Sequence, residues 1–225
     1  MQNKTRSERI KKLTAVAMFC ALAYVCLFLV KIPVQFLTLD VKDSLIALCA
    51  LLFGPLSGVA IAVIVPFLEL ITISGTGVYG FLMNALSSVT FSLTAGLIYR
   101  YRKSMKGAVV GLVSAVFTVT AVMLLANLFI TPYYLGGTTE QVAAMIPSIL
   151  LPFNLIKAVL NAAIVLLLYK PLSNVLKKIG FLQSAGATIP SATTKRASLA
   201  RSLTVTVIAI AVIVASLAVV LLVLR

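Results

Sequence analysis

The sequence contains no histidine and only five acidic residues among its 225 positions. Without histidine it lacks the side chain that most often relays protons or binds metal ions near neutral pH, and neither a Ser–His–Asp nor a Cys–His catalytic set can form. The glycines at 75 and 77 are not followed by the lysine of a phosphate-binding loop, so the chain carries no ATPase motif of its own. We therefore expect no catalytic residue, no metal ligand and no bound cofactor.

Charge is scarce throughout: charged residues make up 11% of the chain, hydrophobic residues 61%, and the mean hydropathy is +1.14. A soluble domain of this size could not cover so much apolar surface. The apolar segments are long and continuous, which predicts helices, whereas a membrane β-barrel would show short alternating segments. The sequence therefore predicts an all-α integral membrane protein. The three cysteines lie inside apolar segments and are expected to pack between helices.

Six apolar segments predict a six-helix transmembrane bundle as the core, within residues 13–182. The second segment is too short to cross a bilayer alone and precedes a Gly54-Pro55 break, so we expect it to pack within the protein. Residues 31–42, before it, are expected to form a loop. The six segments are residues 13–30, 43–53, 56–73, 78–99, 107–130 and 142–169.

The end of the chain differs in composition from the core. Residues 183–202 are rich in Ser, Thr and Ala and predict a flexible linker. A long uncharged run, residues 203–224, then predicts a seventh transmembrane helix within a C-terminal unit of residues 203–225.

The net charge of +14 is concentrated just beyond the ends of apolar segments. Basic residues gather in residues 1–12, after the fourth segment, and between the sixth and seventh. This arrangement is typical of cytoplasmic loops and argues against a nucleic-acid partner. We expect a multi-pass protein of the plasma membrane with a cytoplasmic N-terminus. The loops at 31–42, 74–78 and 131–141 would then face the exterior.

Lys157 places a cation inside an otherwise apolar segment, where burial in lipid would be costly. Asn154 lies one helical turn earlier, on the same face. Asn84 and Asn127 lie near the predicted outer ends of their helices. Each amide alone could join neighbouring helices, but their convergence from one side favours a site for a polar ligand. Glu69 could belong to this site, neutralise Lys157, or lie in water at the outer interface.

Two other features have open interpretations. Asp43 lies at the start of a predicted helix and is expected to be its N-cap or a first-turn acid. The preceding loop could cover a flat ligand or be an ordinary connector. Ala17 and Ala21 form a small-xxx-small pair, which lets a second helix approach closely.

Four segments resemble the riboflavin-binding S components of energy-coupling factor (ECF) vitamin importers, and the similarity extends over about residues 10–180. The resemblance implies a bundle that binds riboflavin from outside and topples within a complex. The complex contains a membrane coupling subunit and two cytoplasmic ATPases. It also implies that the coupling subunit docks on the first helix, at Ala17 and Ala21. The seventh helix departs from the family pattern. The four segments are residues 31–40, 43–58, 77–84 and 152–157.

Riboflavin, as the transported ligand, has a flat ring system and a chain of hydroxyls. Apolar side chains of the first loop could sandwich the ring, while amides and Lys157 could bond the hydroxyls or ring carbonyls. Two alternatives remain open: the same architecture for another small vitamin, or a structural membrane protein whose polar residues only join helices. The expected ligand-binding residues are Phe36, Leu37, Leu39, Glu69, Tyr79, Asn84, Asn127, Asn154 and Lys157.

Overall fold

The computed structural model describes residues 2–179 and 181, together with residues 207, 209–211, 213–215 and 218. The predicted linker, residues 183–202, lies outside these residues. The predicted seventh helix lies outside them as well, apart from the few positions just given, which are helical.

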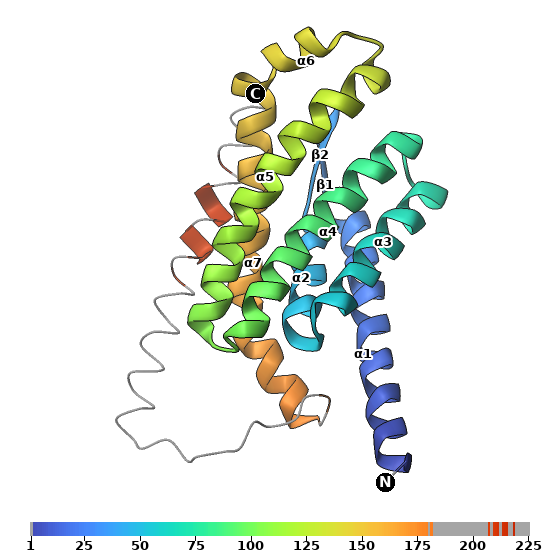
Figure 1. Cartoon of the computed structure of the whole chain (residues 1–225), viewed down its shortest axis with the longest axis vertical. Helices are drawn as coiled ribbons and strands as arrows, with labels where there is room; N and C mark the ends of the chain where they lie inside the picture. Colours follow the sequence, from blue (N-terminus) through green and yellow to red (C-terminus); the bar gives the residue numbers. More distant parts are fainter. Residues whose placement is uncertain are drawn as a thin grey trace.

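Among the residues that the structure describes, five helices are long and apolar enough to cross a membrane, which agrees with an integral membrane protein of several spans. They form the bundle in Figure 1, with the N-terminus at one end. A count of six spanning helices is not confirmed, because one predicted segment forms a shorter helix. The five are α1 (Gln2–Leu29), α3 (Pro55–Thr72), α4 (Gly77–Tyr101), α5 (Met105–Leu135) and α7 (Leu151–Lys178).

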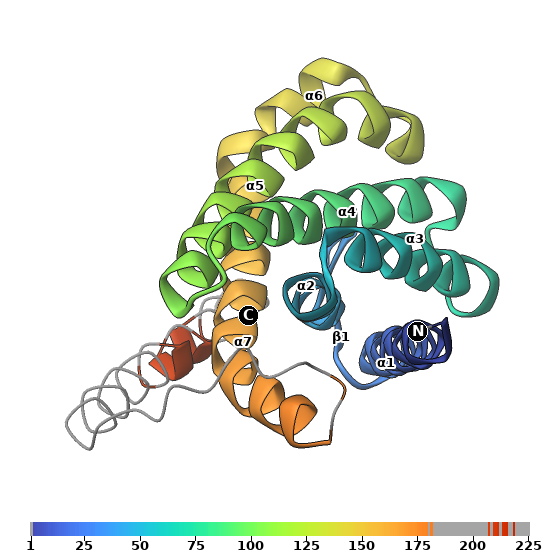
Figure 2. The same cartoon turned by 60° about the horizontal axis from the view of Figure 1, so that its bottom comes forward.

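The short helix α2 (Lys42–Phe53) lies at the centre of the molecule and contacts α1, α3, α4 and α7. Figure 2 shows it end-on among these helices. After its polar first turn its side chains are apolar on all sides, and Ile46 and Leu48 are fully buried, as expected for a helix surrounded by protein. Gly54 ends it with a φ of 102°, in the left-handed region that favours glycine, and Pro55 begins α3.

Helices α2 and α3 approach closely beside this turn. A Cβ placed on Gly58 would lie 2.5 Å from the Cβ of Ala50, so only glycine fits this contact. Gly96 brings α4 against the same alanine, where an added Cβ would lie 3.2 Å away. These small residues hold the three helices together below the hairpin described next.

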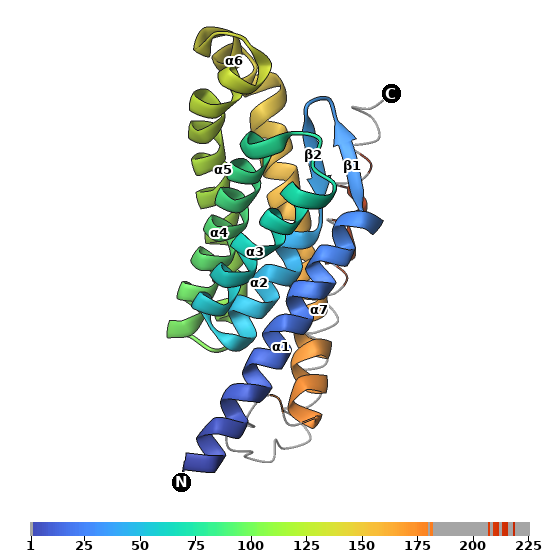
Figure 3. The same cartoon turned by 90° about the vertical axis from the view of Figure 1, so that its right-hand side faces the viewer.

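Residues 31–42 do not form the expected loop. The strands β1 (Lys31–Val34) and β2 (Leu37–Asp40) pair antiparallel, with Lys31 opposite Asp40. Their alternation places Val34 and Leu39 against Leu160 of α7, and this burial stabilises the hairpin. Figure 3 shows the hairpin above α2, where it occupies the part of the bundle's length that this short helix does not reach. The all-α prediction is therefore wrong for this segment.

The sixth predicted segment, residues 142–169, is divided among three helical elements. A short helix, α6 (Thr139–Ala144), covers one end of the bundle and begins with a capping box between Thr138 and Gln141. A single π-helical turn, η1 (Ile146–Leu150), then leads into α7. Pro147 and Pro152 lie at the starts of these last two elements, where their missing N–H groups are tolerated.

Candidate functional site

A cleft opens at the α6 end of the bundle, between the hairpin turn and helices α4, α5 and α7. It contains about 690 Å³ of empty space when its open mouth is included. Concave sites of mixed polarity between helices are typical places for small-molecule binding.

Aromatic rings line this cleft from four different elements. Tyr79 of α4 and Tyr134 of α5 have ring centroids 6.5 Å apart and ring planes tilted by 57°. Phe36 comes from the hairpin turn and Phe153 from α7. Such rings offer flat apolar faces to a ligand, and the tyrosines add a hydroxyl.

Two carboxamides lie deeper in the cleft. Asn127 Nδ2 donates to the carbonyl of Met123 at 2.7 Å, and Asn154 Nδ2 donates to the carbonyl of Leu150 at 2.8 Å. Each amide nitrogen carries a second hydrogen that these bonds do not use. The hydroxyl of Thr131 donates to Asn127 Oδ1 at 2.8 Å, which fixes the orientation of that amide.

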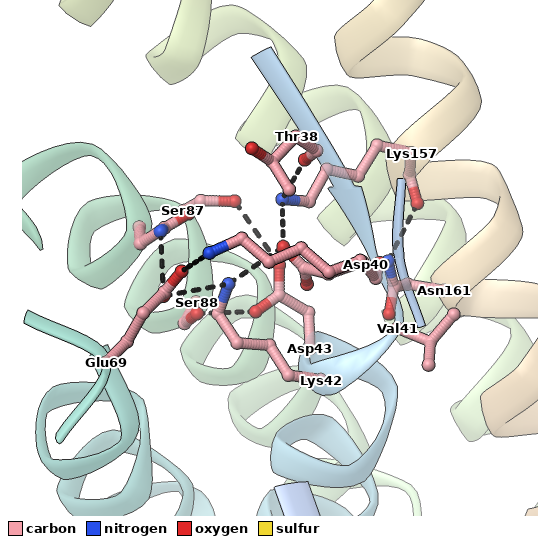
Figure 4. Close-up of polar contacts among 12 residues, drawn as sticks. Thr38, Asp40, Val41, Lys42, Asp43, Glu69, Ser87, Ser88, Lys157 and Asn161 are labelled. Carbon is pink, nitrogen blue, oxygen red and sulfur yellow. Dashed lines mark hydrogen bonds and ion pairs between the residues drawn. The ribbon is translucent and has the colours of Figure 1, made fainter. Parts of the chain in front are cut away.

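Lys157 lies beside these amides and points toward the hairpin. Its ammonium donates to Asp40 Oδ2 at 2.8 Å and to the carbonyl of Thr38 at 3.2 Å. An ammonium has three N–H groups, so one remains for a ligand in the cleft. Figure 4 shows Asp40 at the centre of the polar network, with Lys157 reaching it from α7.

The polar network extends from Asp40 to a second carboxylate, that of Glu69. Lys42 donates to the same Asp40 oxygen at 2.9 Å and lies 4.0 Å from Glu69. Lys31 binds Glu69 at 3.1 Å, and Asn84 donates to the other Glu69 oxygen at 3.0 Å. Paired in this way, the buried charges compensate one another, which a low-dielectric interior requires.

Asp43 completes the set of buried carboxylates. It accepts hydrogen bonds from the hydroxyls of Ser87 and Ser88 on α4. It lies in the first turn of α2, as expected, but Val41 and not Asp43 occupies the N-cap position. Its main contact therefore joins α2 to α4.

Neighbouring charges keep the pKa values of Asp40 and Lys42, the two most buried charged groups, far from neutral pH. Burial raises the pKa of Asp40, but Lys157 and Lys42 outweigh this and keep it well below its usual value. Burial lowers the pKa of Lys42, but Asp40, Asp43 and Glu69 outweigh this and raise it above its usual value. Both groups are therefore charged at neutral pH.

The structure brings most of the expected site residues together and separates two of them. Leu39 is buried against Val34 and Leu160 and does not line the cleft. Glu69 binds Lys31, so the interpretation that it neutralises Lys157 is wrong. The expected residues that line the cleft are Phe36, Leu37, Tyr79, Asn84, Asn127, Asn154 and Lys157.

Sequence reasoning did not find Asp40 as the partner of Lys157, or Asn161 as the residue that anchors the hairpin. Asn161 Nδ2 donates to the Asp40 carbonyl at 3.0 Å, and its Oδ1 accepts from Ser44 N at 2.8 Å. A signal was present, since Asn154, Lys157 and Asn161 follow one helix face at spacings of three and four.

The alanines of α1 divide into two faces. Ala15 and Ala23 are buried against the bundle, whereas Ala17 and Ala21 are exposed. The expected small-xxx-small pair therefore lies on a face of α1 that the rest of the described chain leaves uncovered.

A family model described as "ECF transporter, substrate-specific component" matches residues 11–169, which is more than half of the chain. The chain belongs to this family of ECF transporter S components. Members are the substrate-specific components of transporters, so this S component is a transport protein and not an enzyme, as the sequence resemblance implied.

Two curated relatives carry transporter names. The S component is 32% identical to "Riboflavin transporter RibU" of Staphylococcus aureus (strain TCH60), over 79% of its own length and 98% of the relative. It is 27% identical to "Riboflavin transporter FmnP" of Bacillus subtilis (strain 168), over 72% and 91% of the two chains.

A solved structure agrees with this assignment. It is described as "Structure and mechanism of the S component of a bacterial ECF transporter", and its chain is 32% identical to this one. The two folds superpose with a TM-score of 0.64, covering 79% of this S component and 99% of the solved chain.

Proposed function

We propose that this S component binds riboflavin in the cleft between the hairpin and helices α4, α5 and α7. One observation carries the proposal: a cleft with aromatic walls and amide and ammonium donors occurs in a chain that is 32% identical to a riboflavin transporter. Riboflavin has the matching chemistry, with a flat ring and a hydroxyl-bearing chain. The ring packs against the aromatic side chains that line the cleft, including Tyr79 and Tyr134.

The polar end of the ligand is assigned to the deeper part of the cleft. Asn127, Asn154 and Lys157 donate to its hydroxyls or ring carbonyls. Each bond to a neutral partner adds about 0.5–1.5 kcal/mol to binding, and a bond from the charged Lys157 about 1.5–3 kcal/mol. Leu39 and Glu69 act indirectly, by holding the hairpin and the ion network that position Lys157.

The orientation in the plasma membrane follows from the placement of basic residues. The N-terminus is cytoplasmic, six core segments including the short α2 form the binding unit, and residues 203–224 form a seventh helix. The cleft lies at the end of the bundle opposite the N-terminus, so it receives riboflavin from outside. This direction of binding is that of an importer.

The energy for uptake comes from other subunits, because this chain has no ATPase motif. A membrane coupling subunit and two cytoplasmic ATPases drive transport. The coupling subunit docks on the exposed face of α1 that carries Ala17 and Ala21.

A fluorescence titration tests the binding proposal. Riboflavin fluorescence should be quenched in a saturable, one-to-one manner by the detergent-purified protein, and flavin bound during expression should colour it yellow. Tyr134→Ala should weaken binding because this ring lines the cleft. The matched control is Tyr133→Ala, since Tyr133 is 75% exposed and does not line the cleft.

One result of this titration would contradict the proposal. A folded preparation that binds no flavin at micromolar concentration would exclude riboflavin as the ligand. Competition with flavin mononucleotide and other small vitamins would then identify the compound that the cleft accepts.

A further inference from the structure

A second cavity lies at the other end of the bundle, away from the cleft. It is surrounded by α1, the turn between α2 and α3, the end of α4 and the end of α7, which Figure 2 shows from this side. It contains about 1350 Å³ of empty space when its open mouth is included. This volume is larger than that of the ligand cleft.

The charge of this cavity is of one sign. Lys12 lines it from α1, Arg100 from the end of α4, Lys103 from the connector that follows α4, and Lys177 from α7. No acidic residue is among the described residues that line it, and Glu8, the acid nearest in sequence, is not in the lining. Four cations around one cavity, three on different helices and one on a connector, favour an anion.

The remaining lining fits a molecule with a polar head and an apolar body. Tyr99 and Tyr169, whose hydroxyls share a hydrogen bond, and Ser173 add neutral polar groups. Apolar side chains from the end of α2 and the start of α3 also line the cavity, including those of Leu52, Phe53 and Leu56. A free inorganic anion would leave this apolar wall without a partner.

The depth of the cations matches that of lipid headgroups. Lys12 immediately precedes the apolar part of α1, and Arg100 and Lys177 follow the apolar parts of α4 and α7. All therefore lie near the membrane surface on the side of the N-terminus. Basic pockets between helices on the cytoplasmic side bind anionic lipid headgroups, and anionic lipids are abundant in that leaflet.

We infer that this cavity binds the phosphate of an anionic phospholipid from the cytoplasmic leaflet, with the glycerol and first acyl carbons against the apolar wall. The lipid joins α1 to the ends of α4 and α7 at the face opposite the ligand cleft. The inference is independent of which vitamin the cleft accepts.

The test compares two triple variants of equal charge. Lys12→Gln, Lys103→Gln and Lys177→Gln remove three cations of the cavity. Lys11→Gln, Lys106→Gln and Lys178→Gln remove three nearby cations that do not line it. Both sets are titrated with phosphatidylglycerol and phosphatidylcholine in neutral detergent, and bound lipids are counted by native mass spectrometry. Circular dichroism and gel filtration check that each variant is folded.

The wild type and the control triple should each retain one phosphatidylglycerol and no phosphatidylcholine. The cavity triple should bind the first phosphatidylglycerol at least about tenfold more weakly, since each charged hydrogen bond to phosphate contributes about that factor or more. An equal loss of phosphatidylglycerol binding in both triple variants would show that general surface charge causes the effect, and it would overturn the proposal.

Further outcomes would also overturn it. Equal binding of phosphatidylcholine would remove the role of net lipid charge. Full displacement of the lipid by millimolar glycerol phosphate or inorganic phosphate would identify a soluble phosphate compound as the ligand. Unchanged lipid binding in the cavity triple, with loss of the coupling subunit, would identify the cavity as a protein-docking surface.

Discussion

The ammonium of Lys157 lies 2.8 Å from Oδ2 of Asp40 and joins α7 to the end of strand β2. This contact gives Lys157 two roles, because the same ammonium compensates a buried carboxylate and lines the cleft. Removing the lysine would therefore affect both folding and ligand binding. Separating the two effects needs a second substitution.

Lys157→Met should lower the free energy of unfolding by up to about 3 kcal/mol, because Asp40 keeps only one of its two cations. Adding Asp40→Asn should restore much of this stability. Riboflavin affinity should fall about 10- to 100-fold in both variants, since neither has the charged donor. Thermal unfolding and fluorescence titration measure the two quantities. Wild-type affinity in the double variant would show that Lys157 serves only to hold Asp40.

Asn154 and Asn161 lie on one face of α7 and should differ in their effects. Asn154→Leu should weaken flavin binding about 2- to 10-fold with little loss of stability, since it removes a cleft donor and only one local bond, that to the Leu150 carbonyl. Asn161→Leu should destabilise by about 1–3 kcal/mol, because it removes two buried hydrogen bonds, from Ser44 N–H to Asn161 Oδ1 and from Asn161 Nδ2 to the Asp40 carbonyl. The measurements are flavin affinity and thermal unfolding. The reverse pattern would refute the assignment of Asn154 to the ligand.

Stability and binding should be independent of pH between about 5 and 8. The lowered pKa of Asp40 means that its contribution is present above the usual carboxylate value of about 4 and is lost as pH falls below it. The raised pKa of Lys42 means that its contribution is present below about 10 and is lost only at higher pH.

The measurement is the unfolding temperature and the flavin affinity at stepped pH. In Asp40→Asn the loss of stability on the acid side should be smaller than in the wild type. A titration with a midpoint between pH 6 and 8 would contradict this account, since the chain contains no histidine.

The two alanine faces of α1 should respond differently to enlargement. Ala23→Leu should destabilise by about 1–3 kcal/mol, because Ala23 is fully buried and the core has no room for added carbons. Leucine at Ala17 and Ala21 should leave stability and flavin binding unchanged but weaken capture of the coupling subunit. Co-purification with that subunit is the measurement. Undiminished capture would show that docking uses another surface.

Several features could be predicted because they depend on local sequence. Long apolar runs predict membrane helices wherever they occur, and the Gly54-Pro55 break marked the short buried helix before it. Asn154 and Lys157 could be placed on one face because helical spacing alone decides this. The clustering of basic residues likewise needs no tertiary contact to be recognised.

The sequence by itself thus determined a helical membrane protein of this family and the polar stripe on α7. Only the tertiary structure decided that residues 31–40 form a hairpin, since its strands are stabilised by burial against α7. Only it decided that Asp40 pairs with Lys157, a contact between residues 117 positions apart. An ion pair depends on the distance between two charges in space, and local patterns of hydropathy and periodicity do not contain that distance.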